Sequence, residues 1–172
     1  MNLTARRSSR AARRHRTRTI ALGERLLPRD GSIDGFVAAV AEHRRRPLHV
    51  VDFPLDPVGP SGFWIGTASG DYLIRSAAAT PTRRAAITCH ELAHMLLGHE
   101  PEVGDVQGVE VITTVLAPDV DSSVAARFLA RHGYEATQEK DAEAVATAFV
   151  TTAATRQSAA ATTADRVSTR LR

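Results

Sequence analysis

Residues 88–100 read TCHELAHMLLGHE, a stretch that places three histidines within ten residues. His90 and His94 are four residues apart, and Glu91 directly follows the first of them. On an α-helix a spacing of four residues is slightly more than one turn, about 6 Å along the axis, so both imidazoles project from one face and can meet a single ion. In the H-E-x-x-H pattern of zinc enzymes, the two histidines supply nitrogen ligands to the metal and the glutamate acts as a base.

The residues around this pattern predict a helix from about Thr82 to Leu97. Pro81 stands just before it, where proline is tolerated, and Gly98 stands where a C-terminal cap glycine belongs. The pattern therefore falls on a predicted amphipathic helix, which a chance match does not require. The alternative is that the histidines and the glutamate are polar residues of a helix surface that binds no metal.

A catalytic zinc ion usually takes three protein ligands and leaves a fourth position for water, so a third ligand must be found. His99 does not fit the longer pattern H-E-x-x-H-x-x-G-x-x-H, because Leu97 and Glu100 occupy the positions that require glycine and histidine. We interpret His99 as a helix-end residue near the negative end of the helix dipole.

A carboxylate on a later helix is the alternative source of the third ligand. The segment QEKDAEAVATAF (138–149) predicts a helix that begins near Thr137 and runs to at least Val150. Glu139 and Glu143 are four residues apart and share one face of it. One of them can bind the ion while the other accepts the N–H of a ligating histidine. The spacing alone leaves open which does which, and an ordinary solvated acidic face also fits it.

The rest of the chain supplies a helix and a small set of strands. Asp34 is the expected cap of a helix that runs to about Arg46, where Pro47 ends it. The run LHVVDF (48–53) predicts one short strand, and FWIGTASGDYLIR (63–75) predicts two strands around a glycine-containing turn.

The secondary structure of the segment between the H-E-x-x-H helix and the last helix is less clear from the sequence. Residues 100–118 are ambiguous between strand and helix, and a capped helix is expected to follow through about His132. The Ala/Thr/Arg-rich residues 151–172 are expected to prolong the last helix or to be disordered.

Composition sets the broad class of the protein. With 172 residues, 43% of them apolar, the chain is long enough for one domain with a real core. The single cysteine, Cys89, excludes an internal disulfide framework and suits a reducing compartment. No stretch approaches the roughly 18–20 apolar residues of a membrane span, and no secretory signal follows the basic N-terminus. We therefore expect a cytoplasmic protein without a membrane partner.

Charge is unevenly spread along the chain. Residues 1–19 hold seven arginines and no acid, whereas the remaining residues are net negative. We interpret residues 1–30 as a basic, disordered arm, either a solvated tail or the product of an early start codon, and residues 31–150 as the domain. The alternative is an arm that binds nucleic acid non-specifically, although no aromatic residue is interleaved to stack on bases.

Two segments together, GDYLIRSAAATPTRRAAITCHELAHMLLGH (70–99) and EKDAEAVAT (139–147), resemble the ImmA/IrrE family of zinc metallopeptidases and regulators. The shared features are a strand, a short connector, an Arg-Arg pair, the H-E-x-x-H helix and a later E-x-x-A-[D/N/E]-x-x-A helix. The resemblance covers roughly residues 47–150. It implies an α+β fold with a thermolysin-like, minimal gluzincin core. In such a core a small mixed or antiparallel sheet packs on the H-E-x-x-H helix and on a downstream glutamate-bearing helix, and the C-terminal half is mostly helical.

The resemblance also implies roles for particular residues. His90, His94 and Glu139 would bind one zinc ion, and Glu91 would be the general base. Glu143 falls where the family commonly has Asp or Asn, so it is either the group that orients a ligating histidine or the alternative ligand.

Family members cleave or inactivate helix-turn-helix repressors, which are often encoded beside them. The resemblance therefore implies a zinc endopeptidase that acts on a regulatory protein, in a stress, mobile-element or toxin–antitoxin-like setting. The alternative is a zinc-stabilised regulatory or toxin-like module that binds a partner without cutting it. A DNA-binding regulator that uses the arginine-rich arm is a third hypothesis, which lacks a helix-turn-helix signature.

Peptidase chemistry requires further groups around the ion. We expect the strand formed by Tyr72, Leu73, Ile74 and Arg75 to hold the substrate as an added strand. The nearest potential hydrogen-bond donors to an oxyanion are His132 and Tyr134.

Overall fold

The computed structural model of the chain describes residues 3–55, 57–66, 70–99 and 134–170. Within this part the protein has four helices and a three-stranded mixed sheet, which confirms the expected α+β class and the predominance of helix. The helix expected to end near His132 lies outside the described residues. The elements, in chain order, are α1 (Leu3–Leu26), α2 (Ile33–Arg44), β1 (Leu48–Phe53), β2 (Gly62–Gly66), β3 (Asp71–Ser76), α3 (Pro81–Leu97) and α6 (Ala136–Arg170).

The sheet has the strand order β1-β3-β2. Strand β1 runs parallel to β3, with Leu48 opposite Asp71, and β2 runs antiparallel to β3, with Gly66 opposite Asp71. The strands predicted at 48–53 and within 63–75 are confirmed. The role predicted for the strand of Tyr72, Leu73, Ile74 and Arg75 is wrong, because β3 is the central strand and both of its edges are already hydrogen-bonded.

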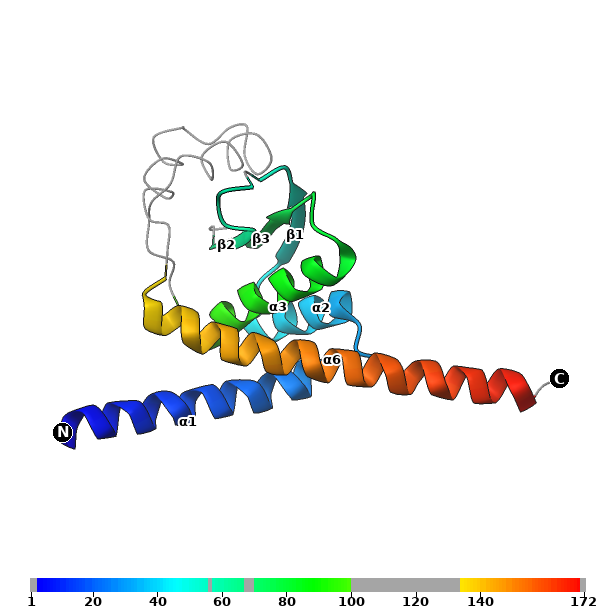
Figure 1. The fold of residues 1–172 in the computed structure, drawn as a ribbon, viewed down its shortest axis with the longest axis horizontal. Coiled ribbons are helices and arrows are strands. Elements are labelled where there is room, and N and C mark those ends of the chain that lie inside the picture. Colours follow the sequence, from blue (N-terminus) through cyan, green and yellow to red (C-terminus); the bar gives the residue numbers. More distant parts are fainter. Residues whose placement is uncertain (1–2, 56, 67–69, 100–133, 171–172) are drawn as a thin grey trace.

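The helices are arranged in layers on one side of the sheet (Figure 1). Helix α3 contacts β2 and β3 on one side and α6 on the other, and α2 contacts β1 and α3. Helix α1 lies outermost and contacts α6, α3 and α2. None of the helices in the described part of the chain combines the length and the apolar character that a membrane crossing requires.

Helix α2 begins and ends slightly differently from its prediction. Its cap is Ser32, whose hydroxyl accepts the Gly35 N–H at 3.2 Å, so the expected Asp34 cap is wrong. The helix ends at Arg44 because the next residue, Arg45, adopts a left-handed conformation with φ of 54°. Pro47 also disfavours helical geometry at Arg46, so the predicted end at about Arg46 is two residues too late.

The main core lies where α2, α3 and α6 meet. The rings of Phe36 and Phe149 pack edge to face with centroids 5.1 Å apart, and both side chains are almost completely buried. Four apolar residues of α6 lie in this core: Ala142, Val145, Ala146 and Phe149.

Residues 1–30 do not form a disordered arm, so that prediction is wrong for the described part of the segment. Residues 3–26 form helix α1, and its C-terminal half packs against the domain, where Thr19 and Leu27 are buried. Gly23 lies directly against the Phe149 ring. The Arg156 guanidinium of α6 donates to the carbonyls of Glu24 and Leu27. The packed face is formed by small and apolar residues spaced four apart. The sequence analysis missed this face because arginines dominate the composition of the segment.

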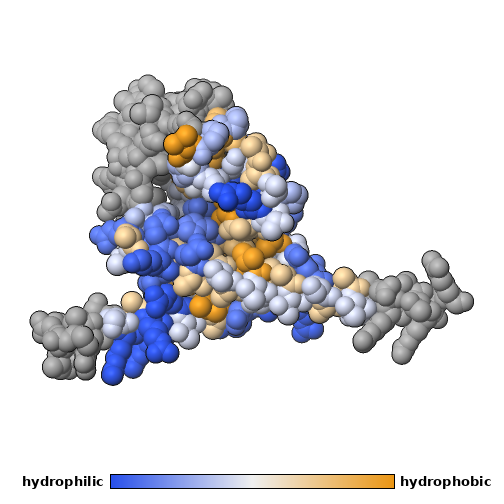
Figure 2. Space-filling model, in the orientation of Figure 1, coloured by the Kyte–Doolittle hydropathy of each residue, from blue (hydrophilic) through white to orange (hydrophobic). Residues whose placement is uncertain are grey.

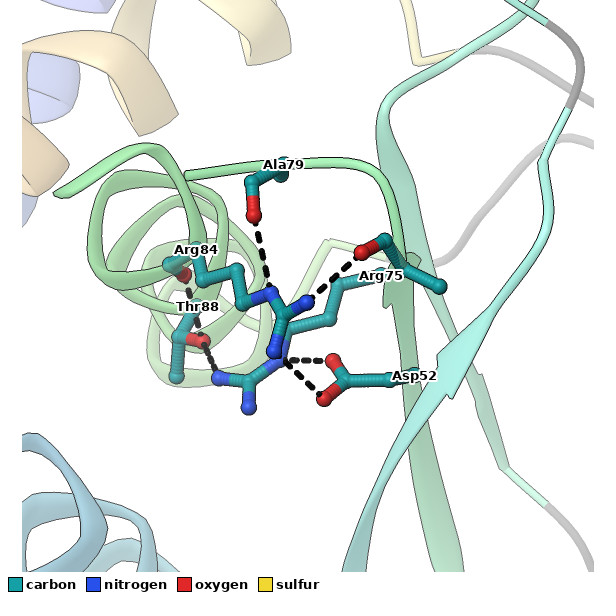
Figure 3. A network of polar contacts seen from close by, with 6 residues as sticks. Asp52, Arg75, Ala79, Arg84 and Thr88 are labelled. Carbon is teal, nitrogen blue, oxygen red and sulfur yellow. Dashed lines mark hydrogen bonds and ion pairs between the residues drawn. The ribbon is translucent and has the colours of Figure 1, made fainter. Parts of the chain in front are cut away.

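A network of polar contacts fixes the start of α3 on the sheet (Figure 3). The Asp52 carboxylate of β1 accepts from Arg75 Nε of β3 at 2.6 Å and from Arg84 of α3 at 3.1 Å. Arg75 also donates to the Thr88 hydroxyl at 3.0 Å, and Arg84 donates to the Ala79 carbonyl at 3.0 Å. Two strands, the connector and the helix are thereby joined through one carboxylate.

The contact between Gly23 and Phe149 can be tested by substitution. At an exposed helix position Gly→Ala stabilises by about 1 kcal/mol through helix propensity. We expect Gly23→Ala to destabilise instead, by roughly 1–3 kcal/mol, because its Cβ would overlap a buried ring. Chemical denaturation monitored by circular dichroism measures the change.

The matched control is Ala21→Gly, at an exposed position of the same helix. It should cost about 1 kcal/mol through propensity alone. A Gly23→Ala variant more stable than wild type would show that α1 does not pack on α6 in this way.

The contacts of the Asp52 carboxylate with β3 and α3 lead us to expect that the stability of the protein depends on pH. The hydrogen bond from Arg75, with the charges of Arg75 and Arg84, lowers the pKa of Asp52. A lowered pKa contributes stability above the unfolded-state pKa of about 3.9, and this contribution is lost as the pH falls through the folded-state value. We expect Asp52→Asn to destabilise the protein at neutral pH, by less than about 1 kcal/mol because the side chain is partly exposed, and to destabilise it less as the pH falls below about 3.9. Melting temperatures of wild type and variant across this pH range measure the difference.

Candidate metal centre

Local sequence explains the course of α3. The Thr80 hydroxyl caps its start by accepting the Arg83 N–H at 3.3 Å, and Pro81 occupies the first turn. At the other end Gly98 adopts a left-handed conformation with φ of 69°. The His99 N–H donates to the His94 carbonyl at 3.1 Å, which with the Gly98 N–H forms a Schellman motif. The predicted boundaries of this helix are confirmed to within one residue.

Helices α3 and α6 bring three potential ligands together. The Nε2 atoms of His90 and His94 are 3.0 Å apart. Oxygens of Glu139 lie 3.4 Å from the first nitrogen and 3.7 Å from the second. One ligand atom from each of the three residues lies within 4.8 Å of the others. This group is compatible with metal binding.

The separations fit a small tetrahedral ion. Zinc binds nitrogen and oxygen ligands at about 2.0–2.1 Å, so two ligands at a tetrahedral angle stand about 3.3–3.4 Å apart. The observed separations of 3.0, 3.4 and 3.7 Å bracket this value. The donor set of two imidazoles and one carboxylate is also the one found in catalytic zinc sites.

The outer nitrogens of the two histidines have partners of their own. His90 Nδ1 lies 3.5 Å from a Glu143 carboxylate oxygen, and His94 Nδ1 lies 3.0 Å from His99 Nδ1. With protons on these Nδ1 atoms, both Nε2 atoms present lone pairs toward each other and toward Glu139. Such an arrangement is repulsive without a cation and favourable with one, as in metal sites whose ligating histidines are oriented by a second group.

His99 is a residue whose role the sequence analysis missed. It lies at the helix end as expected, but it also contacts the buried imidazole of His94, with ring centroids 5.0 Å apart. The sequence does contain a signal for this contact between His99 and His94. A histidine directly after the C-cap glycine returns toward the residue five positions earlier, because the Schellman motif reverses the chain there.

Burial controls the protonation of the groups at the centre. His94 is fully buried, and burial together with His90 and His99 lowers its pKa to about 3. A neutral imidazole keeps the lone pair that a metal requires. Burial and the neighbouring Glu139 raise the pKa of Glu91 to about 8. Within the described residues Glu91 Oε2 is buried without a hydrogen-bond partner, so this carboxyl is a polar group that the fold itself does not use.

Tyr134 also lies at the centre. Its ring stacks on His94 with centroids 3.4 Å apart, and burial together with Glu91 and Glu139 raises its pKa. Its hydroxyl is buried beside the Trp64 side chain, which partly offsets the rise in pKa, but no described group lies close enough to it for a regular hydrogen bond. The structure therefore places this predicted donor beside the cluster, whereas His132 lies outside the described residues.

Helix α1 reaches the same region, which the sequence analysis did not anticipate. His15 Nε2 lies 3.0 Å from the Leu97 carbonyl at the end of α3. Arg16 forms an ion pair with Asp141, midway between Glu139 and Glu143 on α6. One helix therefore contacts both ligand-bearing helices close to the cluster.

Comparison with known proteins finds no matching family model, no matching curated protein and no matching solved structure. The functional interpretation therefore depends on the residues and their geometry, and the resemblance to ImmA/IrrE proteins stays a hypothesis.

The geometry predicts different roles for the two glutamates of α6. Glu139 lies near both Nε2 atoms, whereas Glu143 lies near only the outer nitrogen of His90 and is mostly exposed. We expect Glu139→Gln to weaken zinc affinity by more than about 100-fold, and Glu143→Gln by about 10–100-fold at most, since loss of an orienting group costs that much. Competition with a chromogenic chelator measures both variants, and the reverse order would exchange the two roles.

Proposed function

We propose that this protein is a zinc metallopeptidase. The observation that carries the proposal is the convergence of His90 Nε2, His94 Nε2 and the Glu139 carboxylate across the α3–α6 interface, with Glu91 adjacent in the chain. Three protein ligands leave one position for water or substrate, which distinguishes a catalytic zinc site from a closed structural one.

The residues of the chain have separate tasks in this proposal. A zinc ion held by the three ligands would polarise the scissile carbonyl and lower the pKa of water toward 7. Glu91 takes the proton from the attacking water and later delivers it to the leaving amine. The Glu91 carboxyl is buried and its Oε2 has no hydrogen-bond partner among the described residues, so it is available for this transfer. The Tyr134 ring stacks on His94, and its buried hydroxyl is the candidate donor to a developing oxyanion.

The substrate class in this proposal is a regulatory protein, in particular a helix-turn-helix repressor, and it comes from the resemblance to ImmA/IrrE proteins. An extended segment of such a substrate would add to β1 or β2, since these are the outer strands of the described sheet. Because β3 is internal, its residues can affect the substrate only through the outer strands.

The decisive experiment replaces the proposed base without disturbing the ligands. Purified wild type should hold about one zinc ion per chain, and Glu91→Gln should hold the same amount because both histidines and Glu139 remain. In cells that carry a reporter under a repressor encoded beside this gene, wild type should relieve repression and produce repressor fragments. Glu91→Gln should produce no fragments, because no carboxylate is left to take the proton.

A matched control is Glu143→Gln, which removes a neighbouring carboxylate of the same length but leaves Glu91 and the ligands in place. It should retain measurable cleavage. Full derepression by Glu91→Gln without fragments would refute the enzymatic proposal and favour a module that inactivates its partner by binding. Absence of zinc, both after purification and after reconstitution, would refute the metal centre itself.

A further inference from the structure

The exposed face of α1 is unusually rich in arginine. Arg10, Arg14 and Arg18 follow one another at intervals of four residues, and Arg25 lies seven residues further on. All four side chains are exposed. At about 100° per residue these positions lie on the side of the helix opposite Thr19 and Gly23, which are buried against the domain. Figure 2 shows hydrophilic residues gathered over this part of α1.

These four arginines are not used to hold the fold together. Within the described part of the chain none of them forms an ion pair, whereas Arg16, on the packed side, pairs with Asp141. The first turn of α1 contains no acidic residue. The arginine face is therefore a row of uncompensated positive charges.

The row is unfavourable for the helix that carries it. Like charges four residues apart destabilise a helix. Arg10, Arg14 and Arg18 form two such pairs. The stability of the protein does not explain this pattern, but a polyanion bound along the row would remove the repulsion.

We propose that the arginine face of α1, formed by Arg10, Arg14, Arg18 and Arg25, binds the phosphate backbone of double-stranded nucleic acid without reading its sequence. The row spans sixteen residues, about 22 Å along the axis, which is long enough to contact several phosphates of one duplex. The guanidinium groups match phosphate oxygens in shape and charge. This surface is separate from the metal cluster and does not depend on the proposed peptidase activity.

Other anionic partners fit this surface less well. A helix that binds a membrane surface needs an apolar face free to enter the lipid. The apolar residues Ile20 and Leu26 of α1 instead pack against the core of the domain, and Leu22 is partly buried. Single-stranded nucleic acid is usually held by aromatic residues that stack on the bases, and α1 contains none.

The test measures binding of the full-length protein to a fluorescent duplex of mixed sequence, about 20 base pairs long, by anisotropy between about 50 and 200 mM KCl. The affinity should fall linearly with salt on logarithmic axes. The double variant Arg14→Gln, Arg18→Gln should bind roughly tenfold more weakly at about 100 mM salt, and its slope should be shallower by about 1.8 because two phosphate contacts are lost.

The matched control removes the same charge elsewhere. Arg29 and Arg83 are exposed residues outside α1, so Arg29→Gln, Arg83→Gln should keep the wild-type affinity and slope. Circular dichroism should show the same helix content in all three proteins. The proposal is overturned if wild type does not bind the duplex at the lowest salt, or if both double variants lose affinity equally. It is also overturned if the protein binds vesicles rich in phosphatidylglycerol but not the duplex.

Discussion

The distance between α3 and α6 at the level of His90 and Glu139 is the constraint on which the candidate site depends. The ligand atoms come from two helices that are far apart in the sequence, so no local structure can bring them within 4 Å of each other. The sheet contributes by holding the start of α3 through Asp52, and the Schellman motif holds its end. The core beneath contributes by fixing α6 through Phe149, which has almost no exposed surface. A buried side chain of that size stabilises by about 1.5–3 kcal/mol, so the contact is a substantial share of the stability of a small domain.

Helix α1 contacts both α3 and α6. Its packed side contacts α6 at Gly23 and again at Arg16, and it contacts the end of α3 through His15. Its other side carries the arginine row. One helix thus carries a surface of high positive charge on one side and contacts the region of the candidate ligands on the other. Its packed side requires small residues, whereas its exposed side carries long, charged ones.

Much of α3 and of the ligand set could be predicted from the sequence because the relevant signals are local. Helix periodicity, a proline at the start and a glycine at the end fix the helix, and a spacing of four residues fixes which side chains share a face. Glu139 lies near both Nε2 atoms and Glu143 near an Nδ1 atom, so the group predicted from the sequence is compatible with metal binding.

The errors concern features that only tertiary structure decides. Which strand is central depends on pairing between distant segments, and β3 has the same composition whether it lies at an edge or in the middle. The packed side of α1 is short and made of small residues, and it becomes a binding face only because Phe149 and Arg156 of α6 lie opposite. Ser32 and Asp34 are both good caps, and the choice between them depends on where the preceding chain leaves the core.

Because Glu139 and Glu143 are four residues apart on one face of α6, either of them could in principle occupy the position of the third ligand. If α6 moved along its own axis by about 6 Å and turned by about 40°, Glu143 would stand where Glu139 stands and would offer an ion the same carboxylate. The metal therefore cannot by itself select the register of the helix. The register of α6 is fixed by contacts along its length, among them Phe149 against Gly23, ten residues or about 15 Å from Glu139, and the hydrogen bonds from Arg156 to the carbonyls of Glu24 and Leu27. Which of the two glutamates faces both histidines is thus decided by packing far from the candidate metal site.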